Sequence, residues 1–127
     1  MQSARAVLLD YCATLSSAHF VTPGAAFNDS SIRNLLVYGA NCYHHWLNRV
    51  AQGRPPADID PATVPDVAAL RQLFAAADAS VAEFTQQFGA TWLTPESFAV
   101  PRCKEPLQFT PLALFTHVIT HEFHHKG

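Results

Sequence analysis

The chain has 127 residues, of which 49% are hydrophobic and 14% charged, and its formal net charge is −2. This composition is enough for the core of one domain, expected over residues 1–127, and it excludes a disordered chain. The few Lys and Arg residues are scattered, so nothing points to a nucleic-acid partner. No long apolar segment or polybasic run indicates a membrane. Because Asp10 interrupts the first apolar stretch, we expect mature helix there rather than a signal peptide, and a cytoplasmic protein.

The three cysteines, Cys12, Cys42 and Cys103, are far apart and odd in number, and they form no CxxC pair. A disulfide framework is therefore not expected, and reduced thiols suit a cytosolic chain. We interpret each of them as a small buried hydrophobic residue.

The first predicted helix covers residues 3–17, because apolar side chains recur there at helical spacing. A loop with Pro23 and Gly24 follows it. The apolar face of this helix consists of Val7, Leu8, Tyr11 and Leu15.

The second predicted helix begins at Asp29 or Ser30, which are both good N-caps, and ends near Ala51, before Gly53. Gly39 lies within its apolar stripe, where a small residue would let another helix approach closely. The stripe consists of Ile32, Leu36, Tyr43, Trp46 and Val50.

Residues 54–65 hold four of the nine prolines and are predicted to form a stiff linker outside the core. A third helix follows, with Thr63 as its cap and Pro65 in its first turn, and it ends at Gly89. Its apolar residues recur at spacings of three and four, as in a helix bundle. They are Val67, Leu70, Phe74, Ala77, Val81, Phe84 and Phe88.

Residues 90–109 contain three prolines and show no strong period, and no alternating strand pattern is evident in the chain. The fourth helix has a clear start, with Thr110 as N-cap and Pro111 in the first helical position. The predicted fold is therefore all-α, a four-helix bundle with long proline-rich connections.

Seven histidines occur, and six of them fall in two short clusters. His117, His121 and His125 are four residues apart, so they form one stripe on the last helix. Two imidazoles at i and i+4 can bind one ion from a single turn of helix. We therefore predict that His121 and His125 bind a divalent metal, which could be zinc, nickel or iron.

Further ligands must come from another helix, and the second helix is the natural source. Tyr38, Asn41, Cys42 and His45 fall on one face of it, so a metal site would lie between the second and fourth helices. His44 falls off both faces and is expected to be exposed to solvent.

The sequence HEFHH at 121–125 also matches the H-E-x-x-H pattern of zinc peptidases, with Glu122 as general base. This interpretation is weaker, because only Lys126 and Gly127 remain to supply a further ligand. Such enzymes also need a strand beside the substrate, and none is predicted.

The stretches SIRNLLVYGANCYHHWL at 31–47 and LFTHVITHEFHHKG at 114–127 resemble the DinB/YfiT-like superfamily of metalloenzymes. The most specific part is the final motif, which maps onto His121, His125, Lys126 and Gly127. The resemblance implies a four-helix bundle with three metal-binding histidines. It also implies an activity such as a transferase or isomerase that uses a low-molecular-weight thiol, or a stress-inducible protein.

The chain departs from the family's pattern at the first metal ligand, because Tyr38 stands where a histidine is expected, eight residues before Trp46. The identity of the third ligand is therefore left open among four residues. In a second departure, members of the family usually continue beyond the Lys-Gly pair at which this sequence ends. The four candidates are Tyr38, Cys42, His45 and His117.

We expect a metal-dependent transferase or hydrolase that acts on a small molecule, with a low-molecular-weight thiol as a possible partner and no organic cofactor. Its catalytic residues are not assigned. The alternative is a non-catalytic, dimeric, stress-related bundle with a degenerate metal site. A homodimer is expected in either case, because Trp46 and Leu73 suggest apolar surface beyond one core.

Overall fold

A computed structural model describes residues 2–15, 20–23, 31–55 and 57–126, without the side chains of residues 2, 3 and 121–126. The described chain is mostly helical, as predicted, and includes a small sheet. The helices are α1 (Gln2–Ala13), α3 (Ile32–Tyr43) with its π-helical continuation η2 (His44–Val50), η3 (Pro61–Thr63), α4 (Val67–Phe88), η4 (Gly89–Thr91) and α5 (Pro111–Lys126). The strands are β1 (Glu96–Phe98) and β2 (Leu107–Phe109).

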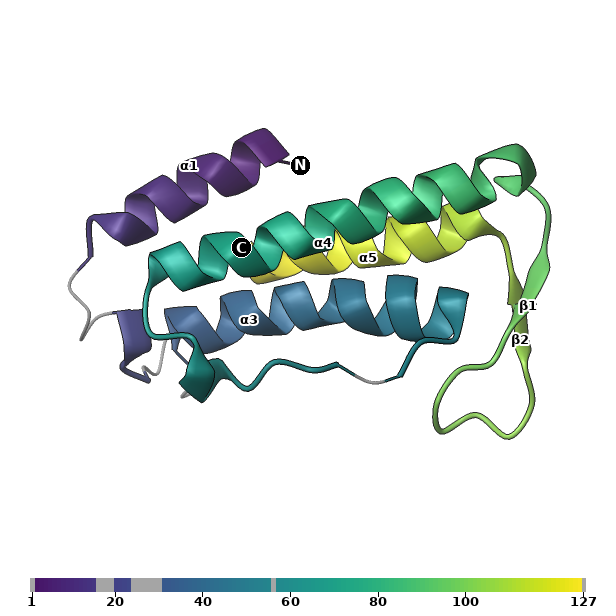
Figure 1. The fold of residues 1–127 in the computed structure, drawn as a ribbon, viewed down its shortest axis with the longest axis horizontal. Helices are drawn as coiled ribbons and strands as arrows, with labels where there is room; N and C mark the ends of the chain where they lie inside the picture. The colour runs from purple at the N-terminus through teal and green to yellow at the C-terminus, as the bar shows by residue number, and fades with distance from the viewer. Residues whose placement is uncertain (1, 16–19, 24–30, 56, 127) are drawn as a thin grey trace.

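The long helices lie side by side, and α3 packs against both α4 and α5 while α1 packs against α4 (Figure 1). The linker after η2 runs back along α3, so that α3 and α4 point in the same direction and α5 runs antiparallel to both (Figure 1). None of the helices in the described part of the chain is long and apolar enough to cross a membrane.

The core lies between α3, α4 and α5. The apolar face predicted for the third helix is confirmed, because five of its seven residues are buried and Val67 and Val81 pack against the core. The largest fully buried apolar side chains are Val37, Tyr43, Leu47, Leu70, Phe84 and Val118.

The face predicted for the first helix is confirmed at Leu8, which packs against the core, but it is wrong at Val7 and Tyr11. Val7 and Tyr11 are 70% and 62% exposed, whereas Leu9 and Cys12 are buried and the helix already ends at Ala13. The physical reason is Arg5, which is buried against α4 and sets the rotation of α1. A hydrophobic pattern does not anticipate a buried cation.

Arg5 is held by charge and by aromatic rings. Its Nη1 donates to Asp78 Oδ1 at 2.6 Å, and its guanidinium carbon lies 4.5 Å from the centre of the Phe74 ring. A second ion pair, from Arg71 to Asp10 at 2.7 Å, also joins α1 and α4, but both of its side chains are exposed. The two pairs therefore join the same helices in different dielectric surroundings.

Asp78→Ala is expected to lower the free energy of unfolding by about 3 kcal/mol, because it leaves a buried guanidinium without its carboxylate. Asp10→Ala, the matched control on the exposed pair, should cost less than about 1 kcal/mol. Urea unfolding of both variants measures the difference. Equal losses would contradict the role assigned to Arg5.

The second helix begins one residue after the later of the two predicted N-caps, Asp29 and Ser30. Ser31 is its N-cap, and its Oγ accepts the Asn34 N–H at 3.0 Å. The predicted stop at Gly53 is confirmed, since Gly53 has φ +68° and the Arg54 N–H bonds to the Asn48 carbonyl six residues earlier, as in a Schellman ending. The π-helical turn before this end was not predicted.

Gly39 shows no close approach of another helix among the described side chains. It is buried, yet a Cβ built on it would meet no described atom within 4 Å. Gly39→Ala should therefore raise the free energy of unfolding by about 0.5–1 kcal/mol, because alanine loses less backbone entropy in a helix. Thermal unfolding tests this, and a lower melting temperature would contradict it.

The prediction that the proline-rich linker lies outside the core is wrong, because the linker contributes a core residue. Val64 is buried, and Thr63 belongs to the short helix η3 instead of capping α4. The N-cap of α4 is Asp66, whose carboxylate accepts the Ala69 N–H at 2.9 Å.

The prediction of a fold without strands is wrong. Strands β1 and β2 pair antiparallel, and the Phe98 and Phe109 rings stack at 4.8 Å. Three-residue strands are too short to show an alternating pattern, which explains the miss. The start of α5 is confirmed, because Thr110 Oγ1 accepts the Ala113 N–H at 3.1 Å and Pro111 is the first helical residue.

The cysteines are free thiols, as expected. Cys12 and Cys42 are buried, but Cys103 is exposed, so the prediction of three buried cysteines is wrong at that position.

Candidate functional site

A cavity of about 570 Å³ lies against α3 and η2 and is bordered by the linker, the turn after β1 and α5. Such a volume is typical of a small-molecule site. Its lining residues are Tyr38, Asn41, Cys42, His45, Trp46, Arg49, Asp58, Val100, Pro101, Arg102 and His117.

The polar face predicted on the second helix forms one wall of this cavity. Tyr38, Cys42 and His45 lie on successive turns of α3 and η2, so their side chains reach the same space. The wall continues through the π-helical turn to Arg49. π-Helical turns inside helices are frequent at functional sites, although periodicity gives no sign of them.

Helix α5 contributes His117 to the opposite side. The rings of Trp46 and His117 meet edge to face with centroids 4.9 Å apart, and His45 meets Trp46 in the same way at 4.8 Å. All four candidates for the third ligand therefore line the cavity. A smaller apolar hollow of about 220 Å³ shares Trp46 and His117 with it and is completed by Phe109, Ala113 and Leu114.

Asn41 fixes the linker against α3. Its Nδ2 donates to the Ile59 carbonyl at 2.9 Å, and its Oδ1 accepts the Ile59 N–H at 2.8 Å. This pair of hydrogen bonds brings the neighbouring Asp58 to the cavity wall. The face predicted for Asn41 is correct, but Asp58 was not predicted, because Asn41 fixes the linker through Ile59, which is 18 residues away along the chain.

Tyr38 and Cys42 interact one helical turn apart. Burial raises the pKa of the Cys42 thiol, the hydrogen bond with Tyr38 partly offsets this, and Asp58 raises it further. The charge of a Cys42 thiolate, with burial and the same hydrogen bond, raises the pKa of Tyr38. In the absence of a bound metal ion, both groups are therefore protonated near neutral pH.

His45 is kept neutral near pH 7. Burial lowers its pKa, Arg49 lowers it further, and Asp58 acts in the opposite direction. A neutral imidazole is the form that binds metals or accepts a proton.

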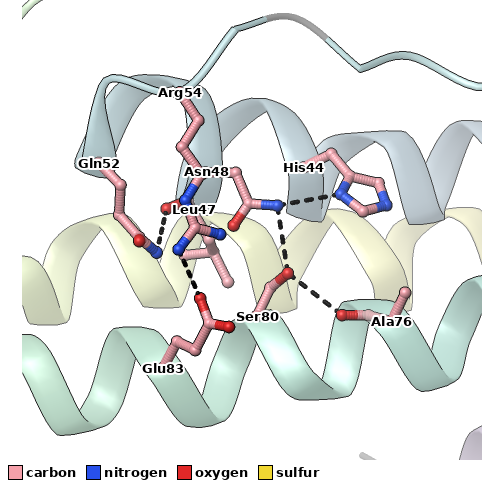
Figure 2. Close-up of polar contacts among 8 residues, drawn as sticks. All are labelled: His44, Leu47, Asn48, Gln52, Arg54, Ala76, Ser80 and Glu83. Carbon is pink, nitrogen blue, oxygen red and sulfur yellow. Dashed lines mark hydrogen bonds and ion pairs between the residues drawn. The ribbon is translucent and has the colours of Figure 1, made fainter.

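His44 is half-buried and points away from the cavity, so the prediction that it faces solvent is wrong. Asn48 Nδ2 lies 3.0 Å from His44 Nδ1 and 3.2 Å from Ser80 Oγ on α4 (Figure 2). Both Asn48 amide hydrogens are then used, so His44 acts as a hydrogen-bond acceptor, in keeping with the lowering of its pKa by burial. His44 therefore belongs to the contact between η2 and α4.

The side chains of His121, Glu122, His124 and His125 lie outside the described part of the chain, as does His19. The backbone of α5 continues to Lys126 and carries positions 121 and 125 one and two turns beyond His117. Within the described side chains alone, no three His, Cys, Asp or Glu residues lie close enough to bind a metal ion.

A search of curated proteins found no match to the chain. The model of the DinB family matches residues 1–127, the whole sequence. The helical architecture, with a polar cavity beside the helix that carries the histidine motif, agrees with this match. The chain belongs to the DinB family.

Proposed function

We propose that this protein is a divalent-metal-dependent transferase or hydrolase that acts on a small molecule, with the four-helix bundle of the DinB-like fold. His121 and His125 bind the metal from α5, and the third ligand is one of Tyr38, Cys42, His45 and His117. The single observation that carries this proposal is that all four of these residues line one cavity between α3 and α5.

The antiparallel arrangement of the two helices supports this position. His117 on α5 contacts Trp46 at the end of the α3–η2 helix. Because the two helices run in opposite directions, a residue four positions later on α5, about 6 Å along its axis, lies opposite a residue about four positions earlier on α3. Position 121 is then expected at the level of Cys42 and position 125 at the level of Tyr38. Ligands from both helices would face the same space.

The chemistry of the donors fits a zinc, nickel or iron ion. Imidazole and thiolate are preferred ligands of these metals, and a metal also lowers the pKa of a coordinating thiol. This would offset the burial that raises the pKa of Cys42. Because the described side chains do not form a three-ligand group, binding depends on the last two turns of α5.

When bound, the metal supplies Lewis-acid activation of a thiol or water. His45, being neutral, serves either as the third ligand or as the acceptor of the proton that the nucleophile releases.

Strands β1 and β2 do not support the interpretation of residues 121–125 as a zinc-peptidase motif. Strand β2 ends just before α5 begins, whereas residues 121–125 lie at the far end of that helix (Figure 1). The intervening helix is about 15 Å long, so the sheet edge cannot align a peptide at Glu122.

The test uses untagged protein stripped with EDTA and then reloaded with zinc, nickel or iron(II). Conjugation of glutathione or cysteine to chlorodinitrobenzene is followed by absorbance. We expect the enzymatic rate to vanish on stripping and to return with about one metal ion per chain. An undiminished rate in EDTA would overturn the proposal.

We also propose a homodimer, although its surface differs from the one expected. Trp46 and Leu73 pack against the core, while Val7 and Tyr11 lie one turn apart and exposed on α1. A two-fold contact can bury such a patch against itself. Light scattering should give about twice the 13.9 kDa of one chain.

Replacing Val7 and Tyr11 together with lysine should yield the monomer mass. Leu93→Lys is the matched control, because Leu93 is 72% exposed and lies outside α1. A parent protein with a mass near 13.9 kDa would refute the dimer.

A further inference from the structure

Two arginines of the cavity wall differ from the other arginines of the chain. Arg5, Arg54 and Arg71 each reach a carboxylate at 2.6–2.8 Å, as Figure 2 shows for Arg54 and Glu83, and Arg33 bonds to Asn34. Arg49 and Arg102 have no hydrogen-bonded or ion-paired partner among the described residues. Both guanidiniums are therefore available to a ligand.

The charge of the cavity is opposite to that of the chain. Two arginines face one carboxylate, Asp58, so the wall carries one net positive charge, while the whole chain carries −2. In the metal-free protein, this single positive charge balances a monoanion better than a dianion such as phosphate, which Asp58 would repel.

Arg102 occupies a backbone position that normally favours glycine. The Cys103 N–H bonds to the Val100 carbonyl at 3.1 Å, which closes a four-residue turn with Pro101 and Arg102 at its centre. Arg102 has φ +72°, as the third position of a type II turn requires, where a non-glycine residue is strained. The turn thus holds a charged side chain at the cavity at a local conformational cost.

We propose that Arg49 and Arg102 bind the carboxylate of a small monoanionic substrate whose hydrocarbon part occupies the adjoining apolar hollow. Guanidinium groups bind carboxylates through paired charge-assisted hydrogen bonds. The hollow of about 220 Å³ shares Trp46 and His117 with the main cavity, so an acidic group and an apolar group of one molecule fit side by side. This assigns the substrate class of the proposed reaction and rests on that proposed function.

The experiment measures binding of benzoate and of benzamide, which have nearly the same shape but differ in charge, to EDTA-treated protein by calorimetry. Because EDTA treatment removes any bound metal ion, coordination of the benzoate carboxylate by a metal cannot explain the binding. Benzoate should bind at least about 10-fold more tightly than benzamide, and this difference should shrink at high salt.

Arg49→Met and Arg102→Gly should each weaken benzoate binding about 10-fold or more, the effect of losing a charge-assisted hydrogen bond. Arg102→Gly relaxes the positive φ, so the protein should keep its melting temperature while it loses affinity. Arg54→Met is the matched control, because Arg54 pairs with Glu83 away from the cavity, and it should leave binding unchanged.

Equal affinity for benzoate and benzamide, or unchanged affinity in both cavity variants, would overturn the inference. The same measurements distinguish failure of the carboxylate site from failure of the proposed metal-dependent function. Selective benzoate binding by a protein that never binds metal would refute the metalloenzyme alone. Stoichiometric metal binding without selectivity for benzoate would refute the carboxylate site alone.

Discussion

Replacing His121 or His125 with alanine is expected to abolish stoichiometric binding of zinc or nickel. In the proposed site these two imidazoles are the ligands that a single rigid helix supplies, and the described residues contain no three-ligand group that could replace them. Affinity should fall at least 100-fold, so that elemental analysis after dialysis finds about one metal per parent chain and none in either variant. Unfolding curves of the variants should resemble that of the parent without metal.

The matched controls are His44 and His19, which are not among the proposed metal ligands. His44→Ala removes the hydrogen bond within η2 that helps to position Asn48, which in turn bonds to Ser80 on α4. His44 does not line the cavity, so the variant should lower stability slightly and leave metal binding intact. His19→Ala should also leave binding intact. If His121→Ala binds metal as tightly as the parent, the assignment of the pair is wrong.

Tyr38→His is expected to tighten metal binding about 10-fold or more. It places an imidazole at the position where the family resemblance implies a first metal ligand. Tyr38 already lines the cavity and is half exposed, so the smaller ring fits without repacking. The size of this gain in metal affinity is taken from the loss of affinity that usually follows removal of a supporting group at a metal site. Competition with a chelator of known affinity measures the gain.

Tyr38→Phe is the control, because it removes the hydrogen bond to Cys42 but adds no ligand. It should not tighten metal binding, and it should raise the pKa of the Cys42 thiol, whose anion loses a hydrogen-bond donor. No gain in affinity for Tyr38→His would mean that Cys42, His45 or His117 already fills the third position.

Features with a local cause could be predicted from the sequence. The start of α5 follows from Thr110 and Pro111, and the buried face of α4 follows from the spacing of Leu70, Phe74 and their successors. The polar face of α3 was also found, because Tyr38, Cys42 and His45 share it by helical geometry alone.

Features that depend on distant partners could not be predicted. The rotation of α1 depends on a buried ion pair between Arg5 and Asp78, 73 residues apart. The position of Asp58 depends on Asn41, and that of Arg102 on a turn whose positive φ an arginine rarely adopts. In all three cases a tertiary contact or a strained turn overrides the conformation or burial that the local sequence favours.

The most direct measurement is a crystal structure of untagged protein grown with zinc, with anomalous data collected at the zinc edge. One strong anomalous peak is expected between α3 and α5, within about 2.0–2.1 Å of a nitrogen of both His121 and His125, beside the cavity that Tyr38 and Cys42 line. A zinc-bound crystal with no peak there, or with its peak at other residues, would contradict the account.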